Sequence, residues 1–225
     1  MIKSFKSLTK TELIIWSASV AIVLVSNIIA GTEPITLSAT LVGVTSLIFI
    51  AKGNVVGQFL TVAFTVLYAI TSYRMRYYGE MITYLGMTLP SAVFAAISWI
   101  RHPYKKGEVK ISKMTPLKAV VMVLFTAAAT ALFYFIMKAL DTPNLAVSTL
   151  SITTSFLASY LTFIRNSYYA VAYAVNDIVL IILWILAAIG DISYLPMIFC
   201  FAMFLINDIY GFISWKKREI SQGLK

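Results

Sequence analysis

Two acidic side chains fall inside apolar stretches long enough to cross a membrane, and each directly follows an asparagine. The pairs are Asn176-Asp177, in AVNDIVLI, and Asn207-Asp208, in LINDIYGF. A carboxylate near the bilayer centre costs at least about 2.5–3.5 kcal/mol on insertion scales, a cost that leucine avoids. Two matching pairs on neighbouring segments therefore predict a polar, functional pocket between helices.

The composition of the apolar stretches indicates what this pocket binds. No Lys, Arg or His lies deep in any of them, so the carboxylates need a proton, a metal ion or a cationic substrate as partner. Tyr173 and Trp184 lie about three helical turns apart and flank Asp177, and aromatic faces beside a carboxylate suit a planar organic cation. A metal fits worse, because hard ions need several carboxylates. We expect an organic cation, with no metal and no cofactor.

The candidate binding residues are polar or aromatic side chains that share helix faces with the two acidic pairs. They are Gln58, Tyr68, Tyr84, Tyr173, Asn176, Asp177, Trp184, Asn207, Asp208 and Tyr210. A buried structural network among the Asn-Asp pairs is the alternative reading. Stripes of Ser and Thr, such as Ser155, Ser159 and Thr162, are interpreted first as helix-packing surfaces.

Sequence motifs of enzymes are missing from this chain. It has no HExxH, GxSxG or GxxxxGK[ST] pattern and no Cys/His pair. His102 falls in a basic loop, where we expect it to be solvated, and Cys200 falls in an apolar run, where we expect a packing role. The sequence therefore predicts a protein that is not an enzyme and does not use ATP.

Composition places the chain in a membrane. Of its 225 residues 60% are hydrophobic and only 12% charged, with a mean hydropathy of +0.87, whereas soluble domains have about 25% charged residues. The net charge of +9 arises from basic residues in short loops beside apolar runs, where they set topology rather than bind nucleic acid. The first apolar run lacks a clear cleavage site, so we expect a retained helix.

The apolar runs predict eight transmembrane helices and their orientation. Their expected ranges are 13–30, 35–51, 55–73, 80–100, 117–139, 145–163, 168–189 and 194–215. With the N-terminus inside, 15 basic residues fall on the inner side and 3 on the outer side. This asymmetry favours an even number of spans with both termini in the cytoplasm.

Spans 2–4 and 6–8 carry matching landmarks, which predict an internal repeat. The first unit ends in Ile97-Ser98-Trp99 and the second in Ile213-Ser214-Trp215, 116 residues later. Asn54 and Asn166 occupy the first inner turns, and Gly79-Glu80 and Gly190-Asp191 precede the last spans. One intervening span makes two three-helix units parallel, an arrangement known in transporters.

Segments RNSYYAVAYAVNDIVLIILW (165–184) and LINDIYGFISWKKRE (205–219) resemble the PnuC family of bacterial vitamin transporters. The resemblance implies an all-α membrane protein with a SWEET-like 3+1+3 core and one extra N-terminal helix. It divides the chain into the extra helix (1–34), the first repeat (35–101), a basic loop with linker helix (102–144), the second repeat (145–216) and a basic tail (217–225).

The same resemblance implies a function. Members carry nicotinamide riboside across the bacterial inner membrane by facilitated diffusion with alternating access, as homotrimers, and cytoplasmic phosphorylation traps the vitamin. Relatives carry thiamine or riboflavin, and a non-transporting membrane subunit is a further alternative. Where the family often has two tryptophans before the span 7 Asn/Asp, this chain has Ala170 and Tyr173. We therefore expect Tyr173 to take the ring-stacking role.

Overall fold

The computed structural model describes Phe5 and residues 7–224, apart from the side chain of Lys106. Lys3, Lys6 and Lys225, which enter the charge asymmetry, lie outside this part. Within the described residues, eight helical segments are long and apolar enough to cross a membrane, as the sequence predicts. They are α2 (Lys10–Ala30), α3 (Pro34–Ala51), α4 (Val56–Arg74), the segment Tyr78–Arg101 with α5 (Tyr78–Thr83) and α6 (Leu89–Arg101), α7 (Pro116–Ala139), α8 (Leu145–Phe163), α9 (Tyr169–Gly190) and α10 (Leu195–Ser221).

Local sequence signals explain where these helices begin and end. Thr9 and Glu12 form a capping box at the start of α2, which satisfies two free backbone N–H groups. Gly31 ends α2 in the left-handed conformation (φ 60°), which glycine adopts without a Cβ clash. Pro34 and Pro116 stand in the first turns of α3 and α7, where the missing N–H costs nothing.

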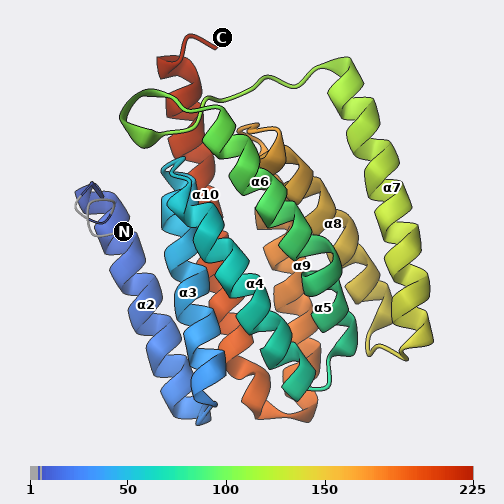
Figure 1. Cartoon of the computed structure of the whole chain (residues 1–225). Helices are drawn as coiled ribbons and strands as arrows, with labels where there is room; N and C mark the ends of the chain where they lie inside the picture. Colours follow the sequence, from blue (N-terminus) through green and yellow to red (C-terminus); the bar gives the residue numbers. More distant parts are fainter. Residues whose placement is uncertain (1–4, 6, 225) are drawn as a thin grey trace.

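Six helices form a closed ring. Around it, α3 packs on α4, α4 on α6, α6 on α8, α8 on α9, α9 on α10, and α10 returns to α3. The order of helices around the ring has two-fold symmetry. Helices α3, α4 and α6 correspond in position to α8, α9 and α10, respectively. Outside the ring, α2 packs on α3 and α10, and α7 packs on α8, so these two helices stand at opposite edges of the molecule (Figure 1).

A short π-helical turn, Tyr84–Thr88, interrupts the fourth span. Pro90 follows it and has no N–H to offer the carbonyl of Gly86, while its ring would clash with that carbonyl in a regular helix. The widened turn lets the Leu89 N–H reach the Tyr84 carbonyl instead. Such turns are frequent at functional sites, and this one turns both Tyr84 and Thr88 toward the centre of the ring.

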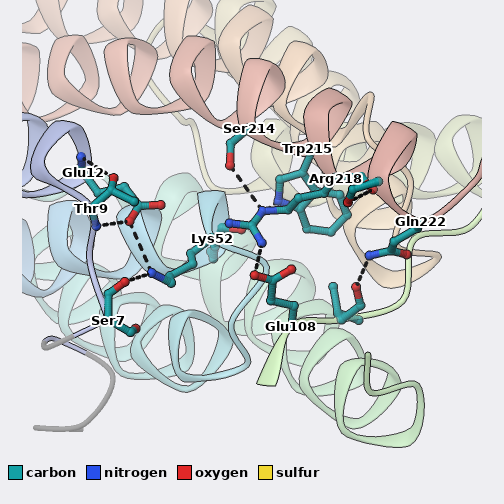
Figure 2. Close-up of polar contacts among 12 residues, drawn as sticks. Ser7, Thr9, Glu12, Lys52, Glu108, Ser214, Trp215, Arg218 and Gln222 are labelled. Carbon is teal, nitrogen blue, oxygen red and sulfur yellow. Dashed lines mark hydrogen bonds and ion pairs between the residues drawn. The ribbon is translucent and has the colours of Figure 1, made fainter. Parts of the chain in front are cut away.

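The C-terminal residues depart from the expected tail. Helix α10 continues to Ser221, beyond the expected start of the tail at residue 217. Arg218 pairs with Glu108 of the loop after α6, and Gln222 Nε2 donates to the Val109 carbonyl at 3.2 Å (Figure 2). Gln222 Oε1 also accepts from the Ile111 N–H at 2.8 Å. Arg218 and Gln222 thus gain partners in the loop after α6, which accounts for the continuation of α10 past residue 217.

Candidate functional site

A small cavity of about 60 Å³ lies at the centre of the helix ring. All six ring helices and the π-helical turn contribute side chains to its wall. The lining residues include Ser46, Gln58, Thr61, Phe64, Tyr84, Thr88, Ser91, Ser155, Ser159, Thr162, Tyr169, Tyr173, Asn176, Asp177, Phe201, Phe204 and Asp208. Pockets for organic ligands usually measure about 300–1,000 Å³, so the helices must separate before a ligand of that size can enter.

The structure brings six of the ten predicted binding residues to this wall. They are Gln58, Tyr84, Tyr173, Asn176, Asp177 and Asp208. The other four, Tyr68, Trp184, Asn207 and Tyr210, do not line the cavity. Ser155, Ser159 and Thr162 do line it, although their stripe was interpreted as a packing surface. The aromatic residues Phe64, Tyr169, Phe201 and Phe204 also line it and were not among the candidates.

Two carboxyl groups meet at the cavity from neighbouring helices. Asp177 on α9 is 2% exposed and Asp208 on α10 is 3% exposed, and the two groups are close neighbours on the cavity wall. Asp177 Oδ2 has no hydrogen-bond partner within the described part of the chain. No Lys, Arg or His of that part lines the cavity. Two negative charges in such a setting are costly unless a proton or a cation accompanies them.

Several other polar atoms on the wall also lack a partner among the described residues. They are Gln58 Nε2, Thr88 Oγ1 and the Tyr169 hydroxyl. Asn176 Oδ1 accepts from Thr154 Oγ1 at 2.8 Å, which leaves its amide nitrogen as a donor. Buried polar groups are normally paired, so this set of donors beside an acceptor is suited to a hydroxylated, cationic ligand.

Aromatic rings supply the apolar part of the wall. Phe64 and Phe204 contact each other with ring centroids 5.4 Å apart. Tyr173 lies opposite the α8 stripe, and its hydroxyl is 3.2 Å from Ser159 Oγ. These rings line the same cavity as the carboxyl pair, and aromatic faces attract cations most strongly where water is excluded.

Comparisons with known proteins place the chain in a transporter family. The family model for the nicotinamide mononucleotide transporter matches residues 33–217. The chain belongs to this family. It is 25% identical over 186 residues to the nicotinamide riboside transporter PnuC of Neisseria mucosa, covering 80% of this chain and 70% of that protein. It is 23% identical over 179 residues to the PnuC of Haemophilus influenzae, covering 78% and 76%.

A solved structure shares the fold of this transporter-family member. The crystal structure of the vitamin B3 transporter PnuC superposes with a TM-score of 0.81 at 22% identity, covering 94% of this chain and 92% of that one. The resemblance noted from residues 165–184 and 205–219 is thereby confirmed.

Toward the helix ends near Arg74 and Gly190, an aromatic layer covers the cavity of this family member. Trp184 Nε1 donates to the Tyr68 hydroxyl at 3.2 Å, and Tyr68 packs on Tyr84 with ring centroids 4.1 Å apart. Tyr77 and Tyr194 pack on the other side of Trp184. Tyr68 and Trp184 therefore lie one layer beyond the cavity, and their predicted part in binding stays a prediction.

Asn207 and Tyr210 face helix α2 rather than the cavity. Asn207 Nδ2 donates to Ser19 Oγ at 3.0 Å and to the Met203 carbonyl at 2.7 Å, and Tyr210 lies beside Thr9 and Glu12. Successive helical residues point about 100° apart. Asp208 can therefore line the cavity while its neighbour Asn207 contacts α2. The two residues of this Asn-Asp pair thus have different roles, one at the cavity and one in helix packing.

At the opposite end of the cavity, two tryptophans make equivalent contacts across the ring. Trp99 of α6 donates to the Thr162 carbonyl of α8 at 3.0 Å, and Trp215 of α10 donates to the Ile50 carbonyl of α3 at 2.9 Å. Their ring centroids are 5.4 Å apart, and both side chains are buried. Both tryptophans are therefore buried packing residues that join the two three-helix sets at this end of the ring.

Proposed function

We propose that this protein carries nicotinamide riboside across the bacterial inner membrane. The observation that carries the proposal is the cavity wall, where two carboxyl groups face aromatic rings and no basic residue of the described chain contributes. The riboside combines a planar pyridinium cation with a hydroxylated ribose. The printed names of the Neisseria mucosa and Haemophilus influenzae relatives support the same cargo.

The wall favours the riboside over the mononucleotide for which the family model is named. A mononucleotide adds a phosphate that carries about −1.5 to −2 charges near neutral pH. Proteins bind phosphate with Arg, Lys or backbone N–H groups at helix N-termini, whereas this wall presents Asp177 and Asp208. Bringing phosphate beside these two groups would add like-charge repulsion in a water-poor site.

The polar atoms without partners suggest a role for each cavity residue. Asp177 and Asp208 balance the pyridinium charge, and Tyr173 with the neighbouring rings stacks against it. Gln58, Asn176 and Tyr169 are placed to bond the ribose hydroxyls and the carboxamide. While the site is empty of cation, a shared proton between the two carboxyl groups lowers the cost of burying them.

The helix ring supports transport by alternating access. Its order is symmetric between the two three-helix units, and the cavity lies between aromatic layers at both ends. Rocking of one unit against the other opens one layer at a time, which gives facilitated diffusion, and phosphorylation in the cytoplasm traps the vitamin. The basic-residue asymmetry supports cytoplasmic termini, and the family resemblance supports a homotrimer.

A ligand titration tests the cargo. Purified protein in detergent is heated with nicotinamide riboside, nicotinamide mononucleotide, thiamine, riboflavin or nicotinamide. A ligand at a hundred-fold excess over its Kd stabilises the bound protein by about 2.7 kcal/mol, which for a chain of this size raises the melting temperature by about 5–10 °C. We expect this shift with nicotinamide riboside and a far smaller one with the mononucleotide.

Other results of the titration would redirect the proposal. An equal shift with the mononucleotide would contradict the charge argument. A response only to thiamine or riboflavin would retain a carrier with another cargo. If none of the five ligands raises the melting temperature of a protein shown to be folded, the result would support a membrane subunit without a substrate.

Asn207→Ala should weaken helix packing and leave ligand affinity intact, because Asn207 contacts α2 and not the cavity. Loss of its hydrogen bonds should cost about 1–3 kcal/mol of unfolding free energy, measured as a lower melting temperature. Ser19→Ala removes the same interhelical bond from the other side and serves as the matched variant. A riboside affinity lowered more than about ten-fold at unchanged stability would return Asn207 to the binding site.

A further inference from the structure

A second, larger opening lies on the outside of the helix ring, between α6, α7 and α8. This lateral groove has a volume of about 720 Å³ and is lined by apolar residues that include Pro90, Phe94, Phe125, Ala128, Leu132 and Phe163. It exists because α7 packs on α8 and leaves the neighbouring surface of α6 uncovered. Figure 1 shows α7 at the edge of the molecule, set apart from α6.

At one end the lateral groove leads into a basic pocket of about 450 Å³. The two share Phe94 and Phe163, and the basic pocket adds Arg101, Lys118 and Arg165, together with His102. This end lies where α6 ends and α7 begins, on the side of the bundle that carries most of the basic residues.

The cations of the basic pocket are not neutralised by the protein. Arg165 Nε donates to the Lys110 carbonyl at 3.0 Å and its guanidinium also contacts Ser98 Oγ, while Lys118 Nζ donates to Ser112 Oγ at 2.7 Å. These partners are uncharged. Within the described residues, no carboxylate forms an ion pair with Arg101, Lys118 or Arg165, and none lines the pocket.

We propose that the lateral groove and the basic pocket together bind one anionic phospholipid. One of its acyl chains lies in the groove between α6 and α7, and its phosphate lies among Arg101, Lys118 and Arg165. An apolar channel at membrane depth that ends in a cationic pocket at the interface matches both parts of such a lipid, and basic pockets between transmembrane helices are known to bind lipid headgroups. A free anion would use only the basic half.

The lipid site adjoins the central cavity. Ser91 of α6 and Ser159 of α8 line both the lateral groove and the cavity. An acyl chain held there supports the two helices on their outer side, at the level where the cargo is expected on the inner side. The lipid proposal does not depend on which cargo is carried, because the residues that test it, Arg101, Lys118 and Ala128, lie outside the cavity.

Native mass spectrometry of the delipidated full-length protein tests the site. The probes are phosphatidylglycerol and phosphatidylcholine with identical acyl chains, and inorganic phosphate. We expect retention of phosphatidylglycerol over phosphatidylcholine. Each basic side chain near an anionic headgroup changes affinity roughly five-fold, so Arg101→Gln with Lys118→Gln should lower phosphatidylglycerol affinity about 25-fold. Lys105→Gln with Lys110→Gln removes the same charge from exposed positions outside the pocket and should change it little.

A groove-filling variant tests the apolar half. Ala128→Trp places a large ring in the lateral groove and should lower retention of both lipids, while the melting temperature confirms that the variant is folded. Equal lipid loss in the two double variants, or binding of inorganic phosphate as tight as that of phosphatidylglycerol, would overturn the proposal. So would a change of oligomeric state in Ala128→Trp without any lipid bound, since this would make the groove a contact with a second copy.

Discussion

Asp177→Asn should lower the affinity for nicotinamide riboside at least about 100-fold and leave the protein at least as stable as before. Asp177 is 2% exposed and its Oδ2 has no partner within the described chain, so a bound pyridinium meets a carboxylate from which water is excluded. Removing one partner of such a buried charge pair costs about 3–5 kcal/mol. Stability should not fall, because asparagine removes a buried acid that the resting protein satisfies poorly.

The measurement is a riboside titration combined with a melting curve for each variant. Asp191→Asn is the matched control, because Asp191 is fully exposed in the turn before α10, where the pKa of its carboxyl is lowered by hydrogen bonds from Ser193. Asp191→Asn should bind the riboside normally. If Asp177→Asn instead melts several degrees lower and binds normally, the acidic pair is a structural network and not a binding site.

The helix count was predictable because membrane insertion imposes strong local rules. A span needs about 20 apolar residues, and each break in this chain carries a turn or charge signal. Gly31 and Pro34 separate α2 from α3, and Asp141 and Asn144 in left-handed conformations separate α7 from α8. These signals lie within a few residues of each other, so no tertiary information is needed to find them.

The site was less predictable, because helix faces are assigned only by packing. Asp177 and Asp208 were recognisable from their burial cost, but nothing in the sequence distinguishes Asn207, which contacts α2, from Asn176, which lines the cavity. Phe201 and Phe204 were missed for a related reason. A phenylalanine that faces lipid, a neighbouring helix or a cavity has the same local sequence signature, and only the ring order of the helices separates these cases.

The internal repeat remains a proposal, and it is supported by the matching contacts of two tryptophans, Trp99 and Trp215. Trp99 and Trp215 are 116 residues apart, and their acceptor carbonyls, Ile50 and Thr162, are 112 residues apart. The turns next to these carbonyls also match, since Asn54 Oδ1 accepts from Val56 N–H and Asn166 Oδ1 accepts from Tyr168 N–H. Each unit thus uses its last helix to bond the first helix of the other unit.

Trp99→Ala and Trp215→Ala should each lower the free energy of unfolding by about 3–5 kcal/mol, the range for deleting a buried aromatic side chain. Symmetric units predict similar losses, measured by unfolding in mixed micelles. Because the two rings pack together, the double variant should lose less than the sum of the single losses. The phenylalanine variants, which keep a ring but remove the Nε1 hydrogen bond, should each lose only about 1 kcal/mol from that bond.

Trp16→Ala provides the comparison for these variants, because Trp16 also donates a hydrogen bond, to Thr45 Oγ1 at 3.1 Å, but is only half-buried on α2. Its loss should be clearly smaller. A large effect at Trp215 with almost none at Trp99 would mean that only one repeat closes the inner end. The inner layer would then open by movement around α10 alone, and symmetric rocking of the two units would have to be abandoned.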